Sequence, residues 1–212
     1  MPFYAVANGR NIGIFLNWND CNDSVKGFKY AKFKKFDTRE EAEEFIQKDE
    51  QPNIEYDYYV YTDGACSNNG KADALAGIGI FFGIGDSRNL SKKIQGKQTN
   101  NAAELTAIIE TYNIIENDII SGKKIAIVSD SEYAINCILS YGEKCSKKGW
   151  NVDIPNKELV KTAYDLYKDK KNVRFIHIKA HTNNTDIHSI GNDNADKLAN
   201  IAIGLESCPY SK

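Results

Sequence analysis

Residues 61–70 read YTDGACSNNG, and their aspartate, Asp63, follows an apolar run at residues 58–62 that predicts a buried strand. Three further acidic residues stand in comparable settings: Glu104 in QTNNAAEL, Asp130 in IVSDSEYAI and Asp196 in GNDNADKLA. Asp130 also ends an apolar strand run, whereas Glu104 and Asp196 lie within amphipathic helical patterns. A sheet edge flanked by two helices can therefore bring all four carboxylates into one cluster.

Such a cluster is unstable without cations, because like charges a few ångströms apart raise one another's pKa. Two Mg²⁺ ions roughly 3.5–4 Å apart would relieve the repulsion and supply the groups for in-line attack on a phosphodiester. Carboxylates suit Mg²⁺, which prefers hard oxygen ligands, whereas a histidine-rich site would suggest zinc. The acidic residues therefore predict metal-dependent phosphodiester hydrolysis.

The composition is that of a globular protein. The chain has 212 residues, 42% hydrophobic and 26% charged, which leaves room for one large domain and one small domain and argues against disorder. No apolar run approaches the 18 or so residues of a membrane span. The N-terminal MPFYAVANG lacks the pattern of a secretory signal or transit peptide, so we expect a cytoplasmic protein.

Cysteine usage and charge are consistent with this view. The five cysteines are scattered and never spaced as C-x-x-C, which indicates reduced thiols and argues against a zinc site. The net charge of −2 becomes +2 once the four clustered acids are neutralised by metal. Residues 26–36 contain five lysines and no acid, so a basic surface that binds nucleic acid is compatible with the overall balance.

The N-terminal part predicts a small α+β domain. Apolar runs at residues 3–7 and 12–16 flank Asn8-Gly9, a dipeptide typical of a tight hairpin turn. A third strand is expected at residues 30–36. Thr38 and Glu41 then have capping-box spacing before a helix. We expect a three-stranded sheet with helical cover over residues 1–48, followed by a polar linker at residues 49–57 that contains Pro52.

The remainder, residues 58–212, predicts an α/β domain. Strands are expected at residues 58–62, 76–82, 88–95, 124–129 and 173–178. Helices are expected at residues 101–116, 131–139, 157–168 and 194–203. Three strands followed by β-α-β alternation predict a mixed five-stranded sheet with helices on both faces.

The order of the motifs resembles the ribonuclease H family. Four motifs follow one another at the family's approximate spacing: TDGACSNNG, TNNAAEL, SDSEYA and AH…GNDNADKLA. The N-terminal part resembles the family's hybrid-binding, viroplasmin-like module in the stretches FYAVANGRNIGIFLNW and AKFKKF. The resemblance covers residues 3–46 and 58–203. It implies a type 1 endoribonuclease that cuts the RNA strand of RNA/DNA hybrids and leaves 5′-phosphate and 3′-hydroxyl ends. Its cofactor would be two Mg²⁺ ions, for which Mn²⁺ can substitute, bound by Asp63, Glu104, Asp130 and Asp196.

Two of the acids have a structural alternative, and a third has a rival residue nearby. Glu104 lies three residues after Asn101 and could close a helix cap, and Asp130 could be the N-cap of a helix that begins at Ser131. Asp193 competes with Asp196 on the last helix. The coincidence of four motifs favours the metal-binding interpretation, and the tail Asp196-Lys197-Leu198-Ala199 matches the family pattern.

Of the three histidines in the sequence, two are candidates for proton transfer or product release. His181, in the loop sequence KAHTNN, resembles the family's mobile histidine. His177 lies in a predicted strand and is interpreted as structural. His188 lies in TDIHSIG, on what we expect to be an extended part of the same loop, and it is the alternative to His181.

The resemblance also implies residues that bind substrate. Backbone groups of Gly64, Cys66 and Asn68 would contact 2′-hydroxyls, and Asn69, Asn100 and Asn101 would contact the minor groove. Lys97, Thr99 and Asn156 match a pocket for a DNA phosphate, although Asn156 could also be a helix N-cap. Lys147, Lys148 and Trp150 resemble a basic protrusion. Hybrid-binding residues in the first domain would be Tyr4, Trp18, Phe33, Lys34 and Lys35, unless Tyr4 and Phe33 are core residues.

Two rival functions remain open. A structure-selective DNA nuclease or recombinase of the same superfamily would share the acids but lack the groups that read 2′-hydroxyls. A non-catalytic binder of hybrids or double-stranded RNA would not need four acids. We expect a monomer that binds an RNA/DNA hybrid and no membrane.

Overall fold

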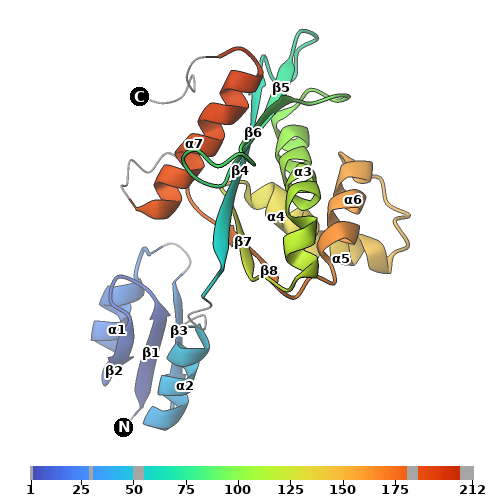
Figure 1. Ribbon diagram of the computed structural model, residues 1–212. Coiled ribbons are helices and arrows are strands. Elements are labelled where there is room, and N and C mark those ends of the chain that lie inside the picture. The colour runs from blue at the N-terminus through green and yellow to red at the C-terminus, as the bar shows by residue number, and fades with distance from the viewer. Residues whose placement is uncertain (1, 29–30, 50–54, 181–185, 206–212) are drawn as a thin grey trace. The chain divides into compact units, whose positions relative to one another are not determined.

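The structure is a computed structural model, and it describes all residues except 1, 29–30, 50–54, 181–185 and 206–212 (Figure 1). The chain divides into two compact units, Met1–Glu55 and Tyr56–Lys212. Asp57, which we assigned to the linker, exchanges hydrogen bonds with Lys124 and so belongs to the second unit. Within the described residues, none of the helices is long and apolar enough to cross a bilayer.

The first unit is a three-stranded antiparallel sheet with two helices. Its elements are β1 (Phe3–Asn8), β2 (Gly13–Phe15), α1 (Trp18–Val25), β3 (Lys32–Phe36) and α2 (Arg39–Asp49), and the strand order is β2-β1-β3. Val6 packs with Cys21 and Val25 of α1, and Phe36 packs against Phe45 of α2. The predicted small α+β domain is therefore confirmed.

Two local features of the first unit differ from expectation. β1 continues to Asn8, β2 begins at Gly13, and the pair nearest the connection is Val6 with Gly13, so residues 9–12 connect the strands and the tight turn predicted at Asn8-Gly9 is wrong. A Cβ at Gly9 would lie 2.7 Å from Val6 Cγ1 and 2.9 Å from Ser24 O, so this glycine allows close approach of α1. α1 itself was not expected from the sequence, and Asn17 caps it by accepting a hydrogen bond from Asp20 N.

The second unit is a mixed five-stranded sheet covered on both faces. Its order is β6-β5-β4-β7-β8, with antiparallel pairing among β6, β5 and β4 and parallel pairing among β4, β7 and β8. Figure 1 shows α3 and α7 on opposite sides of this sheet. The strands are β4 (Tyr58–Ser67), β5 (Leu75–Phe81), β6 (Leu90–Lys93), β7 (Ile125–Ser129) and β8 (Val173–His177). The helices are α3 (Asn100–Ile120), α4 (Glu132–Ile138), α5 (Ser140–Lys147), α6 (Lys157–Tyr167) and α7 (Ile187–Ala202).

Glycines let the two covering helices approach the sheet closely. A Cβ at Gly64 in β4 would lie 2.5 Å from the backbone nitrogen of Glu104 in α3. On the opposite face, a Cβ at Gly79 in β5 would collide with the carbonyl oxygen of Ala195 in α7. These contacts hold the helices that carry Glu104 and Asp196 against the central strands.

Candidate active site

The carboxylates come from four elements that meet at the middle of the sheet. Asp63 lies within β4, which continues to Ser67, so the predicted end of this strand at residue 62 is wrong. β4 is longer because its pairing with β5 extends from Tyr61 to Ser67. Asp130 follows the last residue of β7, as predicted, and Glu104 and Asp196 lie on α3 and α7.

Burial and mutual repulsion act on these groups. The pKa of Asp63, which is 8% exposed, is raised well above its ordinary value by burial and then by the charges of Asp130 and Asp196. Burial and the charge of Asp130 raise the pKa of Glu104 to about 8, against the hydrogen bond from Asn100. The four carboxylates are therefore near enough to interact, as their clustering predicts.

The donor chemistry fits a hard divalent cation. All four side chains offer carboxylate oxygens, and positive charge among them would relieve the repulsion that, after burial, raises the pKa of Asp63. In the described ranges of the chain, no three acidic, histidine or cysteine side chains already form a ready-made metal-binding group. Bringing the carboxylates onto a cation would therefore require side-chain adjustment.

Hydrogen bonds hold each carboxylate in place. The backbone N–H of Gly64 donates to Asp63 at 2.7 Å. Three asparagine amides donate to the other acids: Asn100 to Glu104 at 2.7 Å, Asn192 to Asp130 at 3.0 Å and Asn200 to Asp196 at 2.9 Å. Asn192 and Asn200 are both 2% exposed, and neither was expected at the site from the sequence. The four-residue spacing of Asp196 and Asn200 on a helix was the available signal.

The structural alternatives for Glu104 and Asp130 are wrong. Thr99 caps α3 by accepting a hydrogen bond from Ala102 N, and Ser131 caps α4 by accepting one from Ala134 N. The two carboxylates are therefore not needed as caps. For the last helix, the charge of Asp196 contributes to the raised pKa of Asp63, which favours Asp196 over Asp193.

The histidines occupy different settings. His181 lies outside the described residues. His177, at the end of β8, has its Nε2 3.1 Å from the carbonyl oxygen of Asp130, so it donates there next to the site. The extended loop predicted around His188 is wrong, because α7 begins at Ile187 and His188 packs against Tyr59 and Tyr61. His188 lies eight residue positions before Asp196 on the helix, which corresponds to about 12 Å along the helix axis.

The proposed substrate-binding residues surround β4 and α3. Cys66 Sγ lies 3.7 Å from Gln98 O, and Asn68, in the left-handed region at φ 51°, donates to Asp73 at 2.8 Å. Exposed side chains in this region are Asn69, Lys97 and Asn101. Thr99 and Asn100 are engaged by the contacts described above.

Asn156 is not a side-chain cap. It is the N-cap residue of α6, as the capping alternative predicted, but at φ 56° its side chain makes no cap hydrogen bond among the described residues. Its amide nitrogen lies 3.3 Å from Tyr133 OH, and its buried Oδ1 has no hydrogen-bond partner among the residues that the structure describes. In the basic segment, Lys147 pairs with Glu143, and Trp150 packs against Tyr164 with ring centroids 5.9 Å apart.

An aromatic cluster lies on the surface of the first unit. The ring of Trp18, which is 46% exposed, lies 5.7 Å from Tyr4 and 5.9 Å from Phe33. Phe33 is 41% exposed, so its core alternative is wrong, whereas Tyr4 is half-buried against the small core. Alternation along β3 puts Lys35 on the face of Phe33 and Lys34 on the opposite face, where its Nζ lies 5.3 Å from the Phe36 ring.

Comparisons with known proteins identify the family. A profile described as RNase H matches residues 55–203, and one described as Ribonuclease H1 N-terminal domain matches residues 2–46. The chain therefore belongs to the ribonuclease H family. It is a ribonuclease that carries, ahead of its catalytic unit, the N-terminal domain of the H1 type.

Relatives and solved structures agree with this assignment. Ribonuclease H of Schizosaccharomyces pombe is 30% identical over 93% of this chain and 95% of its own length. Ribonuclease H1 of Homo sapiens is 28% identical over 93% of this chain and 87% of its own length. A foamy viral protease-reverse transcriptase in complex with dsDNA is 25% identical, with a TM-score of 0.57 over 71% of this chain and 96% of that chain.

The metal-free protein should lose stability as the pH rises, and Glu104→Gln should remove part of that loss. The pKa of Glu104 is about 8 in the folded protein and has its ordinary value of 4.5 in the unfolded chain. The contribution of Glu104 to the free energy of unfolding is therefore fully present below pH 4.5 and is lost as the pH rises through 8. Each pKa unit corresponds to about 1.4 kcal/mol. Urea unfolding of the unmodified protein and the variant in EDTA, at a series of pH values between about 4.5 and 8, measures the loss of stability. Glu132→Gln, at an exposed position, is the control, and equal losses in both variants would contradict the prediction.

Proposed function

We propose that this protein is an endoribonuclease that hydrolyses the RNA strand of RNA/DNA hybrids with two Mg²⁺ ions, leaving 5′-phosphate and 3′-hydroxyl ends. The observation that carries the proposal is the group of interacting carboxylates, in which burial and neighbouring charges raise the pKa of Asp63. Membership of the ribonuclease H family supports the choice of RNA as the strand that is cut.

The carboxylates are proposed to hold the cations, with Mn²⁺ able to replace Mg²⁺. When bound, two such ions supply an activated water, neutralise charge on the scissile phosphate and stabilise the leaving oxygen. Asp63, the most deeply buried of the four acids, lies centrally among Glu104, Asp130 and Asp196. The asparagine amides and the Gly64 N–H orient these acids, so fewer side-chain rotations have to be restricted when metal binds.

Recognition of the hybrid is assigned to residues beside the acids. We propose that backbone groups of Gly64, Cys66 and Asn68 meet 2′-hydroxyls, with the amides of Asn69, Asn100 and Asn101 in the minor groove. A DNA phosphate would bind near Lys97, Thr99 and Asn156. The Oδ1 of Asn156 can only accept and an ionised phosphate oxygen has no hydrogen to give, so the Nδ2 of Asn156 is the group that would donate. His181 is proposed to assist proton transfer or product release.

A gel assay tests the proposal. Labelled RNA/DNA, RNA/RNA and DNA/DNA duplexes are incubated with the full chain and Mg²⁺, with and without EDTA. Cleavage of RNA in the hybrid alone, lost in EDTA and restored by Mg²⁺, is the expected result. Cleavage of DNA/DNA would favour a structure-selective DNA nuclease, and binding without cleavage would favour a non-catalytic hybrid binder. Metal-independent cleavage would exclude the proposed mechanism.

Asn200→Ala should weaken Mg²⁺ binding roughly tenfold, the range found when residues that orient metal ligands are removed. Asn200 donates to Asp196 Oδ1, so its loss frees that carboxylate to adopt other rotamers. The Mg²⁺ dependence of the melting temperature and of the cleavage rate both measure the change. Asn194→Ala removes a comparable helical bond, from Asn194 to the carbonyl of Ile190, without touching a carboxylate. Equal changes in the Mg²⁺ dependence of the two variants would show that Asn200 has a merely structural role.

Trp18→Ala combined with Lys35→Ala should weaken binding to long hybrids by about tenfold or more, since stacking and a phosphate contact are both lost. The salt dependence of binding should also flatten by roughly one unit of slope. Lys34→Ala, on the opposite face of β3, should have a smaller effect. Fluorescence anisotropy at several salt concentrations measures these changes, while the single-turnover rate at saturation should stay nearly constant. An unchanged affinity and slope would assign the first unit another role.

A further inference from the structure

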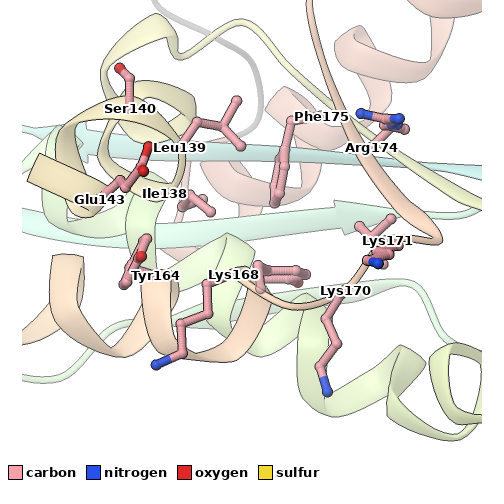
Figure 2. A pocket seen from close by; sticks show the side chains of 12 residues that line it. Ile138, Leu139, Ser140, Glu143, Tyr164, Lys168, Lys170, Lys171, Arg174 and Phe175 are labelled. Carbon is pink, nitrogen blue, oxygen red and sulfur yellow. The ribbon is translucent and has the colours of Figure 1, made fainter. Parts of the chain in front are cut away.

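A basic hollow lies apart from the carboxylates, on the edge of the second unit. It has a volume of about 720 Å³ and is formed by the α4–α5 junction, the end of α6, the turn that follows α6, and β8 (Figure 2). Arg174 in its wall pairs with Ala126, whereas His177, beside Asp130, pairs with Ser129. Three residue positions along the strand, about 10 Å, therefore separate this wall from the acid site.

The hollow combines an apolar floor with a cationic rim. Ile138 and Val173 are buried in the floor, and Leu139 is 51% exposed at the break between α4 and α5. The rim carries four cations: Lys168, Lys170, Lys171 and Arg174. Figure 2 shows that they come from the end of α6, the following turn and β8.

The positive charge is largely uncompensated. Of the twelve described residues that line the hollow, Glu143 alone is acidic, and it is ion-paired with Lys147 outside the hollow. Lys168 is paired with Asp165. In the described parts of the chain, no ion pair joins Lys170, Lys171 or Arg174 to a carboxylate. The N-terminus of α5 also lacks a side-chain cap, and the positive end of the helix dipole there favours a negative group nearby.

We propose that this hollow is a docking site for an acidic segment of a partner protein that carries a large apolar side chain. The apolar side chain would cover Leu139 and the floor, and flanking carboxylates would meet the cationic rim. An apolar anchor surrounded by complementary charge is the arrangement typical of a protein interface. A nucleic-acid backbone would use the cations but would gain nothing from the apolar floor. The inference goes beyond the proposed function and does not depend on it.

The test uses the full chain and a fluorescein-labelled peptide of ten residues, in which aspartates and glutamates flank one phenylalanine and one leucine. Anisotropy should show saturable binding that weakens with salt. Replacing the two apolar residues of the peptide with serine should weaken binding severalfold. Lys171→Glu combined with Arg174→Glu should weaken it about tenfold or more. Lys71→Glu combined with Lys93→Glu, two exposed positions remote in sequence from the hollow, makes the same change in net charge and should have little effect.

Leu139→Ser tests the floor separately and should weaken binding of the apolar peptide but not of its serine counterpart. Three results would overturn the proposal. The first is the absence of peptide binding, and the second is an equal effect of the two charge-reversal pairs on peptide binding. The third is a Lys171→Glu and Arg174→Glu variant that binds labelled single-stranded DNA or hybrid less tightly but binds the peptide as well as the unmodified protein does. The last result would assign the rim to nucleic acid. Circular dichroism of each variant confirms that it is folded.

Discussion

Asp63→Asn is expected to abolish cleavage while binding of the hybrid stays intact or improves. The substitution removes one negative charge from the centre of the carboxylate group but keeps the size of the side chain. Because burial and then the charges of Asp130 and Asp196 raise the pKa of Asp63, its neutralisation removes both a desolvation cost and repulsion and should stabilise the metal-free protein. Single-turnover cleavage at saturating Mg²⁺, hybrid anisotropy and thermal unfolding in EDTA measure the three effects.

Asp193→Asn provides the matched control for this variant. Asp193 lies on the helix that carries Asp196, but its charge is not among those that raise the pKa of Asp63. Cleavage by the Asp193 variant should therefore stay near that of the unmodified protein. If Asp63→Asn lost hybrid binding in parallel with activity, misfolding or a wrongly placed site would be the explanation. Residual metal-dependent cleavage at a normal rate would remove Asp63 from the proposed site.

Gly79→Ala is expected to destabilise the protein by about 3 kcal/mol, at the upper end of the usual cost of overpacking. A Cβ at this position would collide with the carbonyl oxygen of Ala195 and lie 2.6 Å from the backbone nitrogen of Ala199. Both contacts are backbone atoms of α7, so no side-chain rotation can relieve them. The helix would have to move away from β5, and Asp196 would move with it.

Urea unfolding and cleavage assays test this prediction together. Cleavage should fall in the fraction that remains folded, because Asp196 is displaced from the other acids. Lys93→Ala, at an exposed position on the neighbouring strand β6, should change stability by no more than about 0.5 kcal/mol. A Gly79→Ala protein with unchanged stability and activity would show that α7 does not pack as closely on β5 as described.

The sequence predicted the architecture well where the signals are local. Apolar runs and helical periodicity located all five strands of the second unit, and Thr38 was correctly read as a cap, since it accepts a hydrogen bond from Glu41 N at 3.2 Å. Element ends were less predictable. β4 continues through Asp63 because β5 pairs with it, and that pairing joins residues distant in the chain.

Elements with weak periodicity were missed for a related reason. α1 has the largely polar sequence WNDCNDSV, and its stability depends on packing of Cys21 and Val25 against Val6 of a strand. The first turns of α7 were read as loop because the sequence TDIHSIG lacks a clear apolar stripe. In the structure, His188 packs against Tyr59 and Tyr61, which belong to β4.

The sequence by itself determined which acids are proposed for the site and which chemistry they suit, because a preference for hard cations follows from the residue type and the order of the motifs follows from the chain. Tertiary structure alone decided how those acids behave. Burial among non-contiguous elements raises the pKa of Asp63 and of Glu104, and Asn192 reaches Asp130 across 62 residues of sequence. Desolvation and Coulomb interaction depend on distances through space, which no local pattern of residues encodes.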